Sequence, residues 1–78
     1  MRSPIEQYII DQVKAMRLKK KMSQADIAYA LGFESTGYIG LIESTNPENS
    51  EAYNIDHLNE LAKILDCSPK DFWPERPM

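Results

Sequence analysis

The residues that could carry out catalysis are few in this 78-residue sequence. Cys67 is the single cysteine and His57 the single histidine, and the two are too far apart in sequence to form a recognisable nucleophile–base motif. His57 has no cysteine or carboxylate pair at a metal-binding spacing. Asp56 and Glu60 stand one helical turn apart, which indicates a solvated helix face rather than an acid–base pair. The sequence therefore predicts a protein that is not an enzyme, with no metal, no cofactor and no small-molecule substrate.

The length and charge of the chain limit what it can bind. A chain of 78 residues forms one small domain, too small for a deep cleft beneath a separate scaffold. The formal net charge is −3, yet residues 1–39 carry six basic and four acidic side chains, whereas residues 40–78 carry three and eight. Domains that bind nucleic acids are typically basic overall. The composition is thus unfavourable for nucleic-acid binding, although the first half could face a polyanion.

The cysteine content and the apolar segments predict a cytoplasmic protein. A single cysteine cannot form an intrachain disulfide, which fits a reducing compartment. No apolar run has the length of a signal-peptide core or of a membrane span, so we expect neither a signal sequence nor a membrane partner.

Helical periodicity predicts an all-helical chain. Apolar residues fall on one side of a helical wheel from about residue 4 to residue 20, and Ser3 is in position to cap this helix. A second, short helix is predicted over about 23–31. Ser23 opens it with a sequence that resembles a capping box, and Gly32 supplies the left-handed residue that commonly ends a helix.

Three further helices are expected. Ser35 is in position to cap a third helix over about 35–44. The polar segment 45–52 contains a proline and no periodicity, which predicts a surface loop. Asn54 opens a fourth helix, and Pro69 suits the first turn of a short fifth helix. We therefore expect a five-helix domain over residues 4–73, with short tails at 1–3 and 74–78.

The third predicted helix has two unlike sides. One side carries Tyr38, Ile39 and Ile42 and is suited to burial. The other consists of two glycines, two hydroxyl residues and a leucine: Thr36, Gly37, Gly40, Leu41 and Ser44. A glycine inside a helix costs about 1 kcal/mol relative to alanine, so two of them require compensation. Close approach of another backbone, or strong packing of the buried side, would provide it.

Two short helices joined by a turn that contains glycine have the outline of a helix-turn-helix, whose second helix enters the DNA major groove. The outline is weak by itself, because helical hairpins are common. The order of the residues strengthens the helix-turn-helix prediction. Over residues 9–73 the sequence resembles the Xre-type helix-turn-helix family, the group of the phage lambda repressor and Cro. The matching segments are Val13–Arg17, Met22–Ala28, Leu31–Gly32, Tyr38–Ile39, Ile42–Glu43, Leu61–Leu65 and Ser68–Phe72.

The resemblance implies a compact, five-helix, lambda repressor-like domain that binds double-stranded operator DNA as a transcriptional regulator, usually as a homodimer. In the family an arginine late in the first helix often pairs with the glutamate that ends the recognition helix, and Arg17 and Glu43 match these positions. Their places on the helical wheels agree with such an ion pair. Family members commonly contact a backbone phosphate through a glutamine at the position of Gln24. The predicted DNA-contacting residues are Gln24, Ser35, Thr36, Gly37, Gly40, Leu41 and Ser44.

The predicted recognition face departs from the family pattern. The turn at residues 33–35 has one extra residue, and the face lacks the arginine, glutamine or asparagine that could form paired hydrogen bonds with guanine or adenine. The loop at 45–52 carries Glu48 and Glu51, where relatives often place basic residues. We therefore expect weak readout, biased to A·T-rich or shape-defined sites.

A protein-interaction module, such as an antitoxin or adaptor on a helix-turn-helix scaffold, is the alternative. The net charge, the acidic loop and the uncharged face of the third helix all favour a protein partner. Trp73 directly follows Phe72, which we expect in the core, so its indole must point elsewhere. Trp73 is predicted to cover the edge of the bundle or to form a dimer contact.

Overall fold

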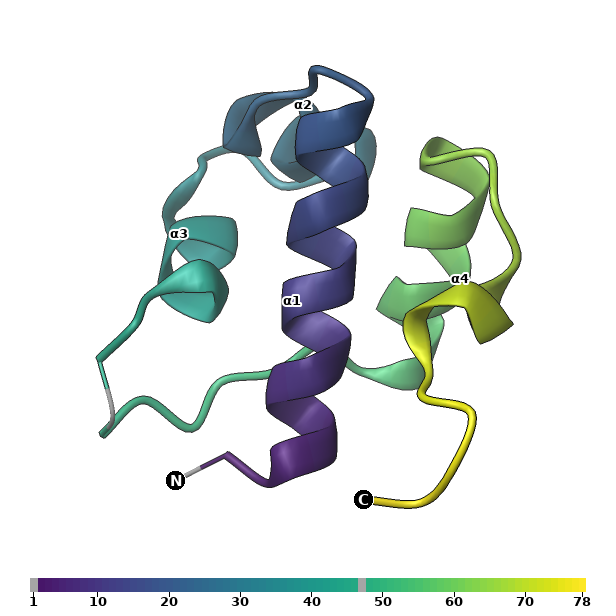
Figure 1. Ribbon diagram of the computed structural model, residues 1–78. Coiled ribbons are helices and arrows are strands. Elements are labelled where there is room, and N and C mark those ends of the chain that lie inside the picture. Colours follow the sequence, from purple (N-terminus) through teal and green to yellow (C-terminus); the bar gives the residue numbers. More distant parts are fainter. Residues whose placement is uncertain (1, 47) are drawn as a thin grey trace.

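The computed structural model describes residues 2–46 and 48–78 and is all-helical over these residues. α1 stands in the middle, with α3 on one side of it and α4 with the short element η1 on the other, while α2 lies near the end of α1 (Figure 1). Met1, in the predicted tail 1–3, and Pro47, in the predicted loop 45–52, are not among the described residues. The elements are α1 (Pro4–Lys19), α2 (Gln24–Ala30), α3 (Gly37–Glu43), α4 (Ile55–Ile64) and η1 (Pro69–Phe72).

Reciprocal hydrogen bonds fix the beginnings of the helices. At α2 the Ser23 hydroxyl accepts from the Asp26 backbone N–H at 3.0 Å, and the Asp26 carboxylate accepts from the Ser23 backbone N–H at 2.8 Å. Ser3 and Glu6 form the same pair at α1, where the bond from the Ser3 backbone lowers the pKa of Glu6. Each cap satisfies a backbone donor that the helix leaves unpaired, which is worth about 1 kcal/mol. Ser68 and Asn54 cap η1 and α4.

The third helix begins later than predicted, at Gly37, and Ser35 does not cap it. A capping side chain needs an extended backbone to reach the helix amides. Thr36, which directly precedes the helix, instead has the helical angles φ −84° and ψ −5° and makes no side-chain cap. The Ser35 hydroxyl accepts only a long bond from the Gly37 backbone N–H at 3.4 Å. Ser35 therefore lies one position before the residue that directly precedes the helix, and its hydroxyl does not cap α3.

The fifth predicted helix is a single 3-10 turn, η1, rather than an α-helix. Prolines on its two sides limit the length of this helix. Pro69 occupies the first turn, and Pro74 restricts Trp73 before it to an extended backbone, observed at φ −99° and ψ 149°. The helix thus cannot continue past Phe72.

The core lies where all five elements meet. Ile39 and Ile42 of α3 are fully buried, so this helix turns the predicted side inward. Phe72 of η1 is also fully buried, and its element packs against both α1 and α4. The remaining buried apolar residues are Ile9, Ile10, Val13, Ile27, Ala28, Tyr53, Leu58, Leu61, Ala62 and Leu65.

Replacement of Phe72 with alanine tests whether η1 closes the core. We expect the free energy of unfolding to fall by about 3–5 kcal/mol, because the substitution leaves a cavity in a fully packed site. Trp73→Ala is the matched control, since Trp73 is 47% exposed and its truncation should cost less than about 1 kcal/mol. Urea denaturation measures both, and equal losses would show that Phe72 is not a core anchor.

Candidate nucleic-acid interface

The outer face of α3 combines five of the residues predicted to contact DNA. Thr36, Gly37 and Leu41 are exposed, and Leu41 keeps 45% of its surface accessible. Gly40 and Ser44 are half-buried. Because Ile39 and Ile42 are buried on the opposite side, the face cannot rotate inward without emptying the core. Ser35 lies exposed in the turn that precedes the helix.

Neither glycine of α3 has a backbone conformation that only glycine can adopt. Gly32 is the glycine with a positive φ, at 92°, and it lies in the turn after α2. A Cβ atom added to Gly37 would meet the Ser35 hydroxyl at 3.6 Å, and one added to Gly40 would meet Gln24 Oε1 at 3.5 Å. Both are ordinary van der Waals distances. Alanine would therefore fit at either position and favour the helix.

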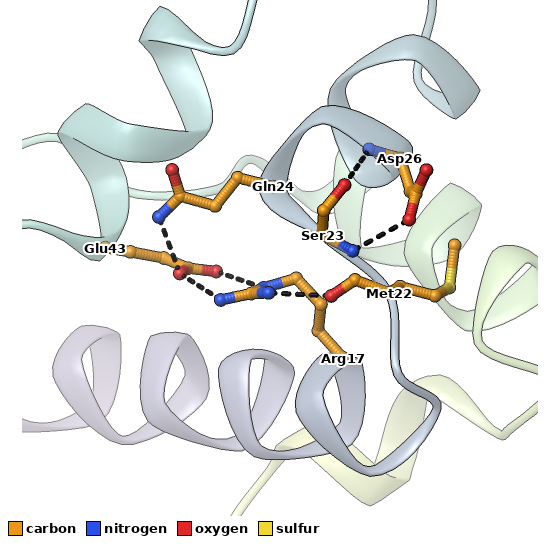
Figure 2. A network of polar contacts seen from close by, with 6 residues as sticks. All are labelled: Arg17, Met22, Ser23, Gln24, Asp26 and Glu43. Atoms are coloured by element: carbon orange, nitrogen blue, oxygen red, sulfur yellow. Dashed lines mark hydrogen bonds and ion pairs between the residues drawn. The ribbon is translucent and has the colours of Figure 1, made fainter.

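The carboxyl end of α3 is held by a buried ion pair between Arg17 of α1 and Glu43, the last residue of α3 (Figure 2). Arg17 Nε donates to Glu43 Oε2 at 3.0 Å, and Nη2 donates to Oε1 at 2.8 Å. The two side chains are 7% and 3% exposed. Arg17 Nη1 also donates to the carbonyl oxygen of Met22 at 2.7 Å. The ion pair expected from the sequence is thus present, and it also fixes the chain just before α2.

Gln24 joins the same network rather than standing free at the surface. Its Nε2 donates to Glu43 Oε1 at 3.1 Å, so Arg17 and Gln24 reach Glu43 from two different helices (Figure 2). The amide carries a second N–H, so this bond does not exhaust its donors. Gln24 was predicted to contact a phosphate. The structure gives it a further role, which is to connect the first residue of α2 with the last residue of α3.

An aromatic cluster, formed by Phe33, Tyr38 and His57, holds the beginning of α3. The Phe33 and Tyr38 rings lie 4.9 Å apart, and the His57 ring lies 5.5 Å from Phe33 and 5.7 Å from Tyr38. The Tyr38 hydroxyl donates to the carbonyl oxygen of Ala52 at 3.3 Å, and burial raises the pKa of Tyr38. The sequence gave no signal for this cluster, because its members come from three separate segments.

The charges around this face are mixed. Glu48 and Glu51 are exposed in the segment that follows α3. Lys20, one of the lysines in the basic first half, lies near Cys67, at the junction of α4 and η1. Burial raises the pKa of the Cys67 thiol, Asp71 raises it further, and Lys20 partly offsets both. The raised pKa makes Cys67 a poor nucleophile at neutral pH.

Features that would favour another kind of site are few. In residues 2–46 and 48–78, histidine, cysteine and acidic side chains form no group of three that could hold a metal ion. No helix in this part of the chain is both long and apolar enough to cross a membrane. A shallow pocket of about 430 Å³ lies between the beginning of α1 and the end of α3 and is lined by Arg2, Ser3, Pro4, Gln7, Ser44, Thr45, Asn46 and Asn49.

Comparison of the chain with protein-family models, with curated proteins and with solved structures finds no match.

Replacement of Glu43 with alanine tests the buried network. We expect a loss of about 3–5 kcal/mol in the free energy of unfolding, because Arg17 would remain buried without its counter-ion. Glu60→Ala is the control. Glu60 pairs with Lys63 at 2.8 Å, but their side chains are 51% and 69% exposed, so its loss should cost less than about 1 kcal/mol. If Glu43→Ala melted at the temperature of the unchanged protein, the ion pair would not stabilise the fold.

Proposed function

We propose that the protein is a DNA-binding transcriptional regulator of the helix-turn-helix class, with α3 as the recognition helix. The observation that carries the proposal is the contrast between the two sides of α3. The inner side is locked by full burial of Ile39 and Ile42 and by the ion pair of Glu43. The outer side is uncharged, exposed at Thr36, Gly37 and Leu41, and half-buried elsewhere, and it has two glycines that the fold itself does not require.

Small residues on an exposed helix face favour close approach to another surface. With no side chain at Gly37 and Gly40, the α3 backbone could come near the edges of the bases in a major groove. The methyl groups of Thr36 and Leu41 would contact thymine methyls, and the Thr36 hydroxyl would bond to a base or phosphate. Ser35 and Ser44 offer further hydroxyls at the two ends of the face, and the second N–H of Gln24 would bond to a phosphate.

This chemistry predicts a preference for A·T-rich or shape-defined sites, since the face has no side chain for paired bonds to guanine. We further propose that the chain has the lambda repressor-like fold that the Xre resemblance implies and acts in the cytoplasm, without enzymatic activity or cofactor. A homodimer with Trp73 at its interface would place two recognition helices about 34 Å apart, matching half-sites separated by one helical turn.

A protein-interaction module remains the second candidate. The exposed Leu41 on an uncharged face, next to a segment with Glu48 and Glu51, would suit a protein partner better than a phosphate backbone. Binding to random-sequence duplex at two salt concentrations separates the two candidates. DNA binding must weaken steeply with salt because counter-ions are released, whereas an apolar protein contact should change little. The absence of salt-sensitive binding would reject the regulator.

Replacement of Gly40 with alanine should separate stability from binding. We expect the free energy of unfolding to rise by about 0.5–1 kcal/mol, because alanine favours the helix and its Cβ fits beside Gln24. Affinity for DNA should fall by about 1–3 kcal/mol, the size of a base-pair mismatch, since the new methyl group would obstruct close approach.

Gly32→Ala is the control for the Gly40 variant, and it should lower stability without changing DNA affinity. Gly32 has a positive φ, so alanine there should strain the turn and lower stability. Affinity should be unchanged at a temperature where the variant is fully folded. Thermal melts and fluorescence anisotropy measure both properties. Unaltered DNA affinity of the Gly40 variant would show that the α3 backbone does not approach the DNA.

A further inference from the structure

The side chain of Arg2 reaches from the segment before α1 to the carboxyl end of α3. Its Nη2 donates to the carbonyl oxygen of Ile42 at 2.5 Å and to that of Leu41 at 3.4 Å. Its Nη1 donates to the carbonyl oxygen of Ser44 at 3.3 Å. Arg2 thus bonds to three carbonyl groups at the end of the helix, although about forty positions separate it from them in the sequence.

The same guanidinium group also ties α3 to two other segments. Nη1 donates to Oε1 of Gln7 in α1 at 3.0 Å, and Nε donates to the carbonyl oxygen of Glu51 at 2.7 Å. A guanidinium group has five N–H donors. Five acceptors surround this one, so no N–H of Arg2 is left for a DNA phosphate.

The end of α3 needs an external cation because its own sequence supplies none. The last carbonyl groups of a helix lack partners within it and carry partial negative charge. The last turn of α3 contains no basic residue, and it ends in the acidic Glu43. Asn49 Nδ2 donates to the Leu41 carbonyl oxygen as well, so polar groups from outside the helix satisfy this end. Arg2 therefore bonds to the last carbonyl groups and offsets their negative charge, as a lysine in the last turn of a helix commonly does.

We infer that Arg2 is a positioning residue for the recognition helix. It sets the orientation of the last turn of α3 and of the segment that follows, and it does so through its forked geometry rather than through contact with DNA. The consequence for DNA binding rests on the function proposed above. The consequence for the free protein does not, so the two can be tested separately.

The first experiment uses the full chain without DNA and compares Arg2→Lys with Arg2→Ala. Lysine keeps the charge but cannot replace the five-bond fork. Arg76→Ala is the matched control, because Arg76 is an exposed arginine at the other end of the chain. Amide hydrogen exchange is read at Ser44 and Asn49, relative to Ile27 in α2. The Ser44 and Asn49 amides donate to carbonyl groups at the end of α3 and in the following segment.

We expect both Arg2 variants to speed exchange at Ser44 and Asn49 by roughly tenfold relative to Ile27, because the end of α3 opens locally. Arg76→Ala should leave this ratio unchanged. If the ratio is also unchanged in both Arg2 variants, Arg2 does not position this end and the inference is overturned.

The second experiment measures binding to a random-sequence duplex at several salt concentrations. We expect Arg2→Lys to weaken binding by about three- to tenfold with an unchanged salt slope, since no phosphate contact is lost. Wild-type affinity in Arg2→Lys, with weaker binding and a slope smaller by about 0.9 in Arg2→Ala, would reveal a phosphate contact and overturn the inference. If the unchanged protein fails to bind DNA, the proposed function falls, and the exchange ratios alone decide the role of Arg2.

Discussion

The arrangement of the first three helices depends on one buried ion pair, Arg17 with Glu43. Two opposite charges removed from water are tolerated only when their hydrogen-bonding capacity is satisfied. Here the carboxylate accepts three bonds, two from Arg17 and one from Gln24, and the remaining arginine Nη1 bonds to the Met22 carbonyl oxygen. These partners come from α1, from the turn that follows it and from the first residue of α2. A shift of α3 would break several charged hydrogen bonds at once.

α3 depends on such external support because it is weak as a helix. It has seven residues, two of them glycine, and its first residue is preceded by Thr36 without a side-chain cap. A helix of this length has little stability of its own in water. Its beginning is held by the aromatic cluster and its end by Glu43 and Arg2. The orientation of the exposed face is therefore a property of the whole domain and not of the residues that form the face.

The sequence predicted the features that depend on neighbouring residues. The capping boxes at Ser3 and Ser23 are recognisable because a serine and an acid three residues later satisfy each other within one turn. The buried side of α3 followed from helical spacing. The start of α3 was misjudged, because a serine near a helix signals a cap only if the backbone before the helix is extended. The short fifth helix was expected at Pro69, but spacing alone did not show that it is a 3-10 turn.

The contacts that join distant segments could not be predicted in the same way. Arg2 lay in a predicted tail, and His57 was a single histidine with no partner at a metal-binding spacing. Their roles appear only when the chain brings them to the two ends of α3. The Arg17–Glu43 pair was the exception, because the resemblance to a known family suggested it in addition to the helical wheel. DNA contacts at Gln24 and along α3 stay predictions, as do a homodimer through Trp73 and a protein partner.

The reliance of α3 on Arg2 and Arg17 also has a kinetic side. Both arginines precede α3 in the chain, and the bonds they make to its last residues span 26 to 42 positions. The chain must lose the entropy of closing these loops before the bonds can form, whereas a helical turn joins only neighbouring residues. The exposed face of α3 should therefore acquire its final shape late in folding, after α1 has docked. A proteolytic fragment that begins after α1 would retain every residue of that face and yet fail to present it.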